Sequence, residues 1–139
     1  MPNKNIFCNS PWYELQIYWD GSLGFCCQED HKLYPDNQSN YYNVRNMSIC
    51  EWFNSLPMRQ ARVGILGDTK NSICTRCYFE ESVSNTSRRH RSNQKSVIFT
   101  KGNFTESYNQ SPGYSKFQHS LENNGAYVGM PIDLHIDLG

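Results

Sequence analysis

The sequence lacks a long apolar run, and this absence excludes several classes of protein. Nowhere in the 139 residues do about 18 apolar residues follow one another, which is the length that a membrane-spanning helix needs. The first residues, MPNKNIFCNSPW, contain no apolar stretch of signal-peptide length. We therefore expect a cytoplasmic protein that neither enters a membrane nor is exported.

An excess of charge of one sign is also missing. The 13 basic and 13 acidic residues cancel at neutral pH, so the chain as a whole has no attraction for nucleic acid. Only 37% of the residues are hydrophobic, and the mean hydropathy is −0.72. A chain of one-domain length with so little apolar material predicts a thin core that depends on an additional cross-link.

Histidines with the spacing of a metal site are absent. The four histidines are scattered, so we expect them to be exposed or to serve packing: His31, His90, His119 and His135. Cysteines, in contrast, number six. Because a cytoplasmic compartment keeps thiols reduced, these cysteines favour metal or cluster ligation over disulfides.

Residues 12–27 have the pattern of a β-hairpin that turns at Asp20-Gly21. A two-residue turn would place Ile17 opposite Gly24 and Leu15 opposite Cys26, with Cys26 on the inward face and Cys27 on the outward one. Proline cannot donate to a strand ladder, so the segment CNSP is expected to turn and to bring Cys8 back toward the inward face.

The middle of the chain predicts a loop and two helices. Residues 28–43 are polar and favour a loop, Ser48 and Glu51 form a capping box, and a second helix is expected from Pro57 to Gly67. One apolar face should pack on the hairpin: Ile49, Trp52, Phe53 and Leu56. The large aromatic side chains are assigned to the core and to shielding of a buried site: Trp12, Trp19, Trp52, Phe25 and Phe53.

Beyond residue 82 the periodicity weakens, and we expect residues 83–129 to be a linker with local structure. The last residues, 130–139, alternate apolar and polar positions and predict a strand. On such a strand Asp133, His135 and Asp137 would point the same way. The cationic cluster of Arg88, Arg89 and Arg91 has two interpretations, a solvated surface or a counter-charge for a negatively charged cluster.

Four of the cysteines form a metal-binding pattern. Cys74 and Cys77 make a Cys-x-x-Cys pair, which together with Cys8 and Cys26 supplies four thiolates from separate elements. Four thiolates are what a closed zinc site or a [4Fe-4S] cluster requires, and a thiol-redox role for the Cys-x-x-Cys pair is a third possibility. We expect Cys27 and Cys50 to be small buried packing residues instead.

Three stretches of the sequence resemble a known family. CNSPWYELQIYWDGSLGFCC, NVRNMSICEWFNSLPMRQARVGILG and ICTRCYFEE are similar to the SPASM/twitch auxiliary iron-sulfur domain of radical S-adenosylmethionine (radical SAM) proteins, over residues 6–82. The resemblance implies one [4Fe-4S] cluster held by Cys8, Cys26, Cys74 and Cys77, with zinc as the alternative metal. It also implies that residues 130–139, MPIDLHIDLG, are the first strand of a radical SAM barrel.

The sequence departs from complete radical SAM enzymes in one respect. The CxxxCxxC motif that holds their catalytic cluster is absent from these residues. We therefore expect the N-terminal part of a truncated or split enzyme, inactive alone, that needs a barrel in cis or trans before it can use S-adenosylmethionine. Its substrate would be a peptide or a small molecule. The predicted fold is α+β, a small β-hairpin plus short helices around a four-cysteine site, followed by a poorly structured linker and a terminal strand.

Overall fold

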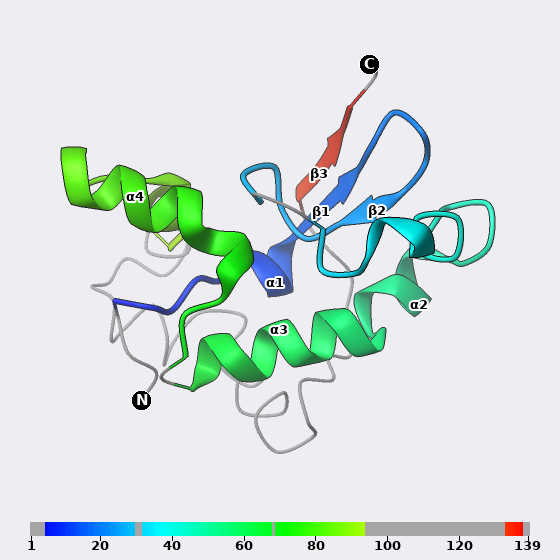
Figure 1. Cartoon of the computed structure of the whole chain (residues 1–139), viewed down its shortest axis with the longest axis horizontal. Coiled ribbons are helices and arrows are strands. Elements are labelled where there is room, and N and C mark those ends of the chain that lie inside the picture. Colours follow the sequence, from blue (N-terminus) through cyan, green and yellow to red (C-terminus); the bar gives the residue numbers. More distant parts are fainter. Residues whose placement is uncertain (1–4, 30–31, 68, 94–132, 138–139) are drawn as a thin grey trace.

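The computed structural model describes residues 5–29, 32–67, 69–93 and 133–137 (Figure 1). Its helices are α1 (Ser10–Tyr13), α2 (Ile49–Phe53), α3 (Leu56–Leu66) and α4 (Thr75–Ser84), with short 3-10 turns η1 (Asp36–Gln38) and η2 (Ser72–Cys74). Its strands are β1 (Glu14–Ile17), β2 (Leu23–Gly24) and β3 (Asp133–Ile136). The architecture is α+β, as the sequence predicts, and residues 94–129 of the expected linker lie outside the described residues.

The strands form one sheet in the order β2-β1-β3. The central strand β1 is antiparallel to β2 and parallel to β3, with Leu15 opposite Leu134. The predicted terminal strand is therefore confirmed, and it pairs with the N-terminal hairpin of its own chain (Figure 1). The expected common face of Asp133, His135 and Asp137 lies outside the side chains that the structure describes.

The predicted hairpin register is wrong by one residue. Ile17 pairs with Leu23, and not with Gly24. Strand β2 then ends at Gly24, so that Cys26 lies beyond the strand and does not face Leu15 across the ladder. The burial of Cys26 must therefore have a cause other than strand alternation.

The register differs because the hairpin loop has three residues, 19–21, where two were expected. The Tyr18 amide donates to the Ser22 carbonyl over 2.9 Å, and the Gly21 amide donates to the Tyr18 carbonyl over 2.8 Å. The Asp20 carboxylate accepts hydrogen bonds from the amide and hydroxyl of Ser22, and Gly21 adopts a φ of 84°. A turn followed by a left-handed glycine is a common three-residue hairpin loop.

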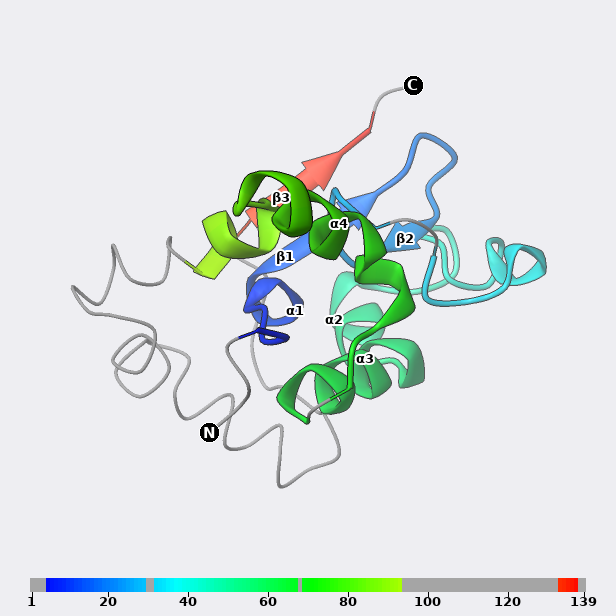
Figure 2. The ribbon, with the colours of Figure 1, turned by 60° about the vertical axis from the view of Figure 1, so that its left-hand side comes forward.

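The first residues of the expected strand are helical. Helix α1 covers Ser10–Tyr13, and Pro11 lies in its first turn. Backbone N–H groups in a first turn have no partner within the helix, so the N–H that proline lacks is not needed there. The expected turn before the strand therefore exists, but it takes the form of one helical turn. Figure 2 shows α1 lying between strand β1 and helix α3.

The capping box and the two central helices are confirmed. Glu51 donates its amide to the Ser48 hydroxyl, and its carboxylate accepts from the Ser48 amide. Trp52 and Phe53 are buried as expected, whereas Leu56 is 53% exposed. The prediction for Leu56 is wrong because helix α2 ends at Phe53 and α3 begins at Leu56 as a separate helix. The periodicity of the first helix therefore does not continue into the second.

The core is aromatic and contains a buried cation. Trp12, Trp52, Phe25 and Phe53 are buried, but Trp19 is 73% exposed, so its assignment to the core is wrong. Trp19 lies in the longer hairpin loop, which projects from the sheet (Figure 1).

Arg62 is fully buried in this core. Its Nε donates to the Pro11 carbonyl over 3.0 Å, and its guanidinium carbon lies 4.6 Å from the centre of the Phe53 ring. This side chain ties α3 to α1.

Packed structure continues past the expected border at residue 82. Helix α4 ends at Ser84, and residues 88–93 form a further helical turn. The Ser92 hydroxyl is 2.9 Å from the Ser10 hydroxyl, and the Asn93 side-chain amide donates to the Phe7 carbonyl over 3.0 Å. These polar contacts join the segment to the N-terminal residues. Because they are polar, they give the sequence no apolar periodicity from which this packing could be predicted.

Two glycine substitutions test the hairpin loop. At Gly21 an alanine would have to adopt the left-handed conformation, and its Cβ would lie 2.8 Å from Asn43 Oδ1. We expect Gly21→Ala to lower the free energy of unfolding by about 1–2 kcal/mol. The matched control is Gly64→Ala, inside α3 with open space around the new methyl group, which should raise it by up to about 1 kcal/mol. Urea denaturation measures both, and equal midpoints for Gly21→Ala and the parent would contradict the three-residue loop.

Candidate metal centre

Four buried cysteines come from three well-separated parts of the chain. Cys8 precedes α1, Cys26 follows β2, and Cys74 and Cys77 lie at the start of α4. Their relative exposures are between 6% and 9%. These are the four cysteines that the sequence pattern selects.

The four thiols lie close enough for their charges to affect one another or a common neighbour. The charge of Cys77 acts on Cys8, that of Cys8 acts on Cys26, and Tyr78 is affected by both Cys74 and Cys8. Burial, followed by the negative charges of neighbouring groups, raises the pKa of Cys8 to about 12 and that of Cys26 well above its ordinary value. Bare thiolates are therefore disfavoured here, and a bound cation or cluster would offset their cost.

Cys26 is held by a turn. The Glu29 amide donates to the Cys26 carbonyl, and the Glu29 carboxylate accepts hydrogen bonds from the Phe25 amide and the Tyr18 hydroxyl. Burial raises the pKa of Glu29 to about 7. Cys26 is buried, as expected, but this turn is the cause and not strand alternation.

The other three thiols are placed by helix starts. The Cys8 thiol donates to the hydroxyl of Ser10, the first residue of α1, over 3.2 Å. Cys74 occupies the position directly before α4, and Cys77 lies in the first turn of that helix. The side chain of Asn71 accepts from the Ile73 amide and fixes the short turn η2 that leads into Cys74.

The remaining cysteines differ from the prediction. Cys27 and Cys50 are both exposed, so the expectation that they are buried packing residues is wrong. Cys27 lies in the turn after β2, and Cys50 is on the solvent side of the short helix α2, whose other face buries Trp52 and Phe53.

Within residues 5–29, 32–67, 69–93 and 133–137, no three His, Cys, Asp or Glu side chains are placed to hold a single metal ion. Thiolates on one tetrahedral zinc ion stand about 3.8 Å apart, given a zinc-sulfur distance of about 2.3 Å. Around a polynuclear cluster the ligand sulfurs stand further apart, because the cluster itself separates them.

The cationic cluster is mostly buried. Arg89 is 3% exposed and bonds to Glu81 through two nitrogens, and Arg88 Nη2 lies 2.8 Å from Glu14 Oε1. The interpretation as a solvated surface is therefore wrong for Arg88 and Arg89, although Arg91 is exposed.

Sequence reasoning missed Glu14, which is buried in β1 and whose charge acts on Cys8 and Cys26. A polar residue next to Leu15 is typical of the solvent side of a strand. The helical turn at residues 88–93 covers that side of β1, and only the folded chain reveals this.

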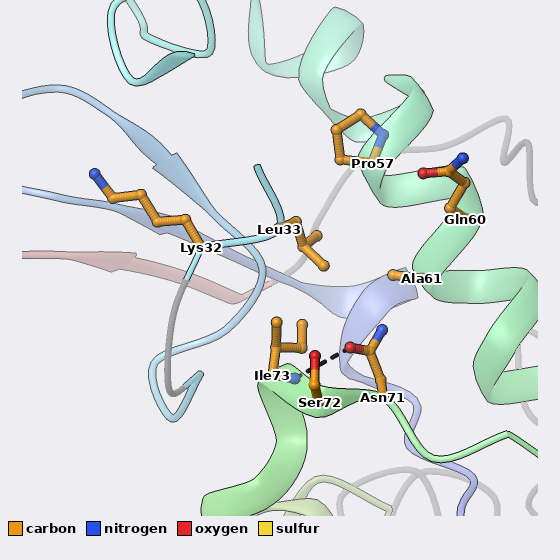
Figure 3. A pocket seen from close by; sticks show the side chains of 8 residues that line it. All are labelled: Lys32, Leu33, Pro57, Gln60, Ala61, Asn71, Ser72 and Ile73. Carbon is orange, nitrogen blue, oxygen red and sulfur yellow. Dashed lines mark hydrogen bonds between the residues drawn. The ribbon is translucent and has the colours of Figure 1, made fainter. Parts of the chain in front are cut away.

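A hollow of about 220 Å³ lies beside this centre, between α3, the segment 32–33 and η2 (Figure 3). It is lined by Lys32, Leu33, Pro57, Gln60, Ala61, Asn71, Ser72 and Ile73. The Lys32 ammonium points away from it and donates to the hydroxyls of Ser22 and Ser39 (Figure 3). The hollow therefore presents amide, hydroxyl and apolar groups, and its lining contains none of the thiols.

The described part of the chain contains no helix that combines the length and the apolar character needed to cross a membrane. In a comparison with protein families, the model of an iron-sulfur cluster-binding domain named SPASM matches residues 8–78. No curated protein and no solved structure matched the chain. The family match covers just over half of the chain and includes all four buried cysteines. The chain therefore belongs to the SPASM family of iron-sulfur cluster-binding domains.

Proposed function

We propose that Cys8, Cys26, Cys74 and Cys77 together hold one [4Fe-4S] cluster, which supports one-electron transfer or substrate anchoring in a radical SAM enzyme. The observation that carries the proposal is the selective burial of these four thiols, while Cys27 and Cys50 remain exposed. The four belong to segments up to 69 residues apart in the sequence, from residue 8 to residue 77. A shared cluster would explain why all four are buried.

The protein's own contribution is to bury the thiols and to exclude water. Trp12, Trp52, Phe25 and Phe53 are buried in the same core cluster as Cys26 and Cys74. A water-poor environment strengthens the bonds of a thiolate-ligated centre and limits its loss to solvent. The bound cluster would supply the redox chemistry, whereas the residues set its position and surroundings.

The alternative is an interaction module in which zinc binds to the same four thiols. Zinc and iron-sulfur sites share thiolate ligands, so the ligand types do not separate them. Zinc would require the four sulfurs to converge on one ion, and the described side chains contain no such compact group. The family match, to an iron-sulfur domain, also favours iron.

A radical SAM context is supported by strand β3. Strand β3 is at the edge of the described sheet, where a further strand could pair. Cleavage of S-adenosylmethionine needs a cluster iron with an open position, which three cysteines leave and four close. We propose that a barrel carrying CxxxCxxC, in cis or in trans, performs that step, and that a peptide or small molecule is the substrate.

Replacing the ligands tests the site. We expect Cys8→Ser, Cys26→Ser, Cys74→Ser and Cys77→Ser each to remove most of the bound iron and to destabilise the fold, because a core this thin depends on its centre. Iron and sulfide analysis after anaerobic purification measures the loss. Visible absorption with iron and sulfide supports the cluster, whereas a colourless protein with stoichiometric zinc supports the alternative.

The matched controls are Cys27→Ser and Cys50→Ser, whose side chains are exposed. Both should keep the iron content of the parent. If Cys27→Ser empties the site while Cys26→Ser leaves it filled, the proposed ligand set is wrong.

A second test concerns catalysis by the 139 residues alone. The chain, reconstituted with iron and sulfide and fully reduced, should form no 5′-deoxyadenosine from S-adenosylmethionine above a control without protein. Chromatography of the reaction mixture measures the product. Catalytic turnover would show that the cluster has an open iron, and that one of the four proposed ligands does not bind.

A further inference from the structure

A buried ion pair joins Arg89 and Glu81. Arg89 Nε and Nη2 lie 2.8 Å from the two carboxylate oxygens of Glu81, a bidentate arrangement. Arg89 is 3% exposed, and the side chain of Glu81 is 16% exposed. The pair is therefore far less hydrated than an ordinary surface salt bridge.

This pair is attached to the segments that carry two of the proposed ligands. Arg89 Nη1 donates to the Phe7 carbonyl over 2.8 Å, in the peptide group directly before Cys8. Glu81 lies on α4, four residues after Cys77 and on the same side of that helix.

Charges in this position act on the electron affinity of a cluster. Reduction adds one negative charge to the centre, so a nearby cation favours the reduced form and a nearby anion favours the oxidised form. The effect is larger for buried charges because solvent and salt screen them less.

We propose that the Arg89–Glu81 pair sets the reduction potential of the cluster, with Arg89 raising it and Glu81 lowering it. The inference rests on the proposed function, since it requires Cys8 and Cys77 to be ligands. Arg89 and Glu81 are not ligands themselves. They contact the segments that carry the ligands, and they are therefore positioning residues.

The experiment compares Arg89→Gln with Glu81→Gln in the full chain, loaded anaerobically with iron and sulfide. Each protein is titrated with dithionite in the presence of redox mediators, and the reduced cluster is followed by electron paramagnetic resonance. We expect the potential of Arg89→Gln to lie below that of the parent, and that of Glu81→Gln to lie above it. One fixed pH is used, because His90 Nε2 lies 3.0 Å from Arg89 Nη2 and 3.7 Å from Glu81.

Opposite shifts separate an electrostatic role from a structural one, since loss of either partner weakens the same bonds. The control is Arg76→Gln, on the same helix as Glu81. Arg76 pairs with Glu80, and its side chain is 58% exposed. It should leave the potential close to the parent value. Arg89→Lys keeps the positive charge but cannot form the bidentate contact with Glu81. Its reduction potential should therefore lie closer to that of the parent than the potential of Arg89→Gln does.

Shifts in the same direction, or shifts no larger than that of Arg76→Gln, would overturn the proposal. If Arg89→Gln does not fold, Glu81→Gln decides, and a potential at or below the parent value then refutes it. Iron and sulfide content is measured in every sample. A parent chain without a cluster would refute the proposed function, whereas an intact cluster with an unmoved potential would refute this inference alone.

Discussion

The structure depends on bringing four ionisable thiols out of water at one place in a thin core. Burial raises the pKa of Cys8, Cys26 and Cys77, so the site is costly while its thiols are bare and charged. The thiols reach it from before α1, after β2 and the start of α4. Each of these places is a helix start or a turn, where a few side-chain hydrogen bonds can fix one residue. Long regular elements are not required, and the described helices and strands are short.

The segment around Cys8 shows how such a site is fixed without much apolar area. Arg62 bonds to the Pro11 carbonyl from α3, and Arg89 bonds to the Phe7 carbonyl from the helical turn at residues 88–93. These carbonyls lie on the two sides of Cys8 in the sequence. Hydrogen bonds to charged groups contribute more than neutral ones, particularly when they are buried. Two arginines from distant elements therefore hold the peptide that presents the thiol.

Local signals were readable from the sequence, and long-range polar contacts were not. The capping box of Ser48 and Glu51 is confirmed because both partners lie within one helical turn. The hairpin register was missed because Asp20 and Gly21 fit both a two-residue and a three-residue loop, and the bonds to Ser22 decide between them. The burial of Arg89 was missed for a different reason. Its partner carbonyl at Phe7 is 82 residues away in the sequence, and no periodicity reports such a contact.

The same reasoning explains which parts of the site were predicted. The selection of Cys8, Cys26, Cys74 and Cys77 used spacing and the number of ligands that a thiolate centre requires, and each of the four is buried. The predicted cause of the burial of Cys26 was wrong, but Cys26 is buried as predicted. A turn anchored by Glu29 can direct a side chain inward as effectively as a strand can. The burial of these thiols is therefore more robust to errors in local structure than the path of the chain between them.

Two of the carboxylates near the thiols are paired with guanidinium groups. Glu14 bonds to Arg88, and Glu81 bonds to Arg89. These pairs add no net charge, and the negative charge of four thiolates would remain uncompensated by them. Compensation must come from what the thiolates bind, which couples folding of the ligand segments to loading of the centre. In the proposed site, the bound metal would balance the charge of the thiolates, and the paired residues would adjust the field around them.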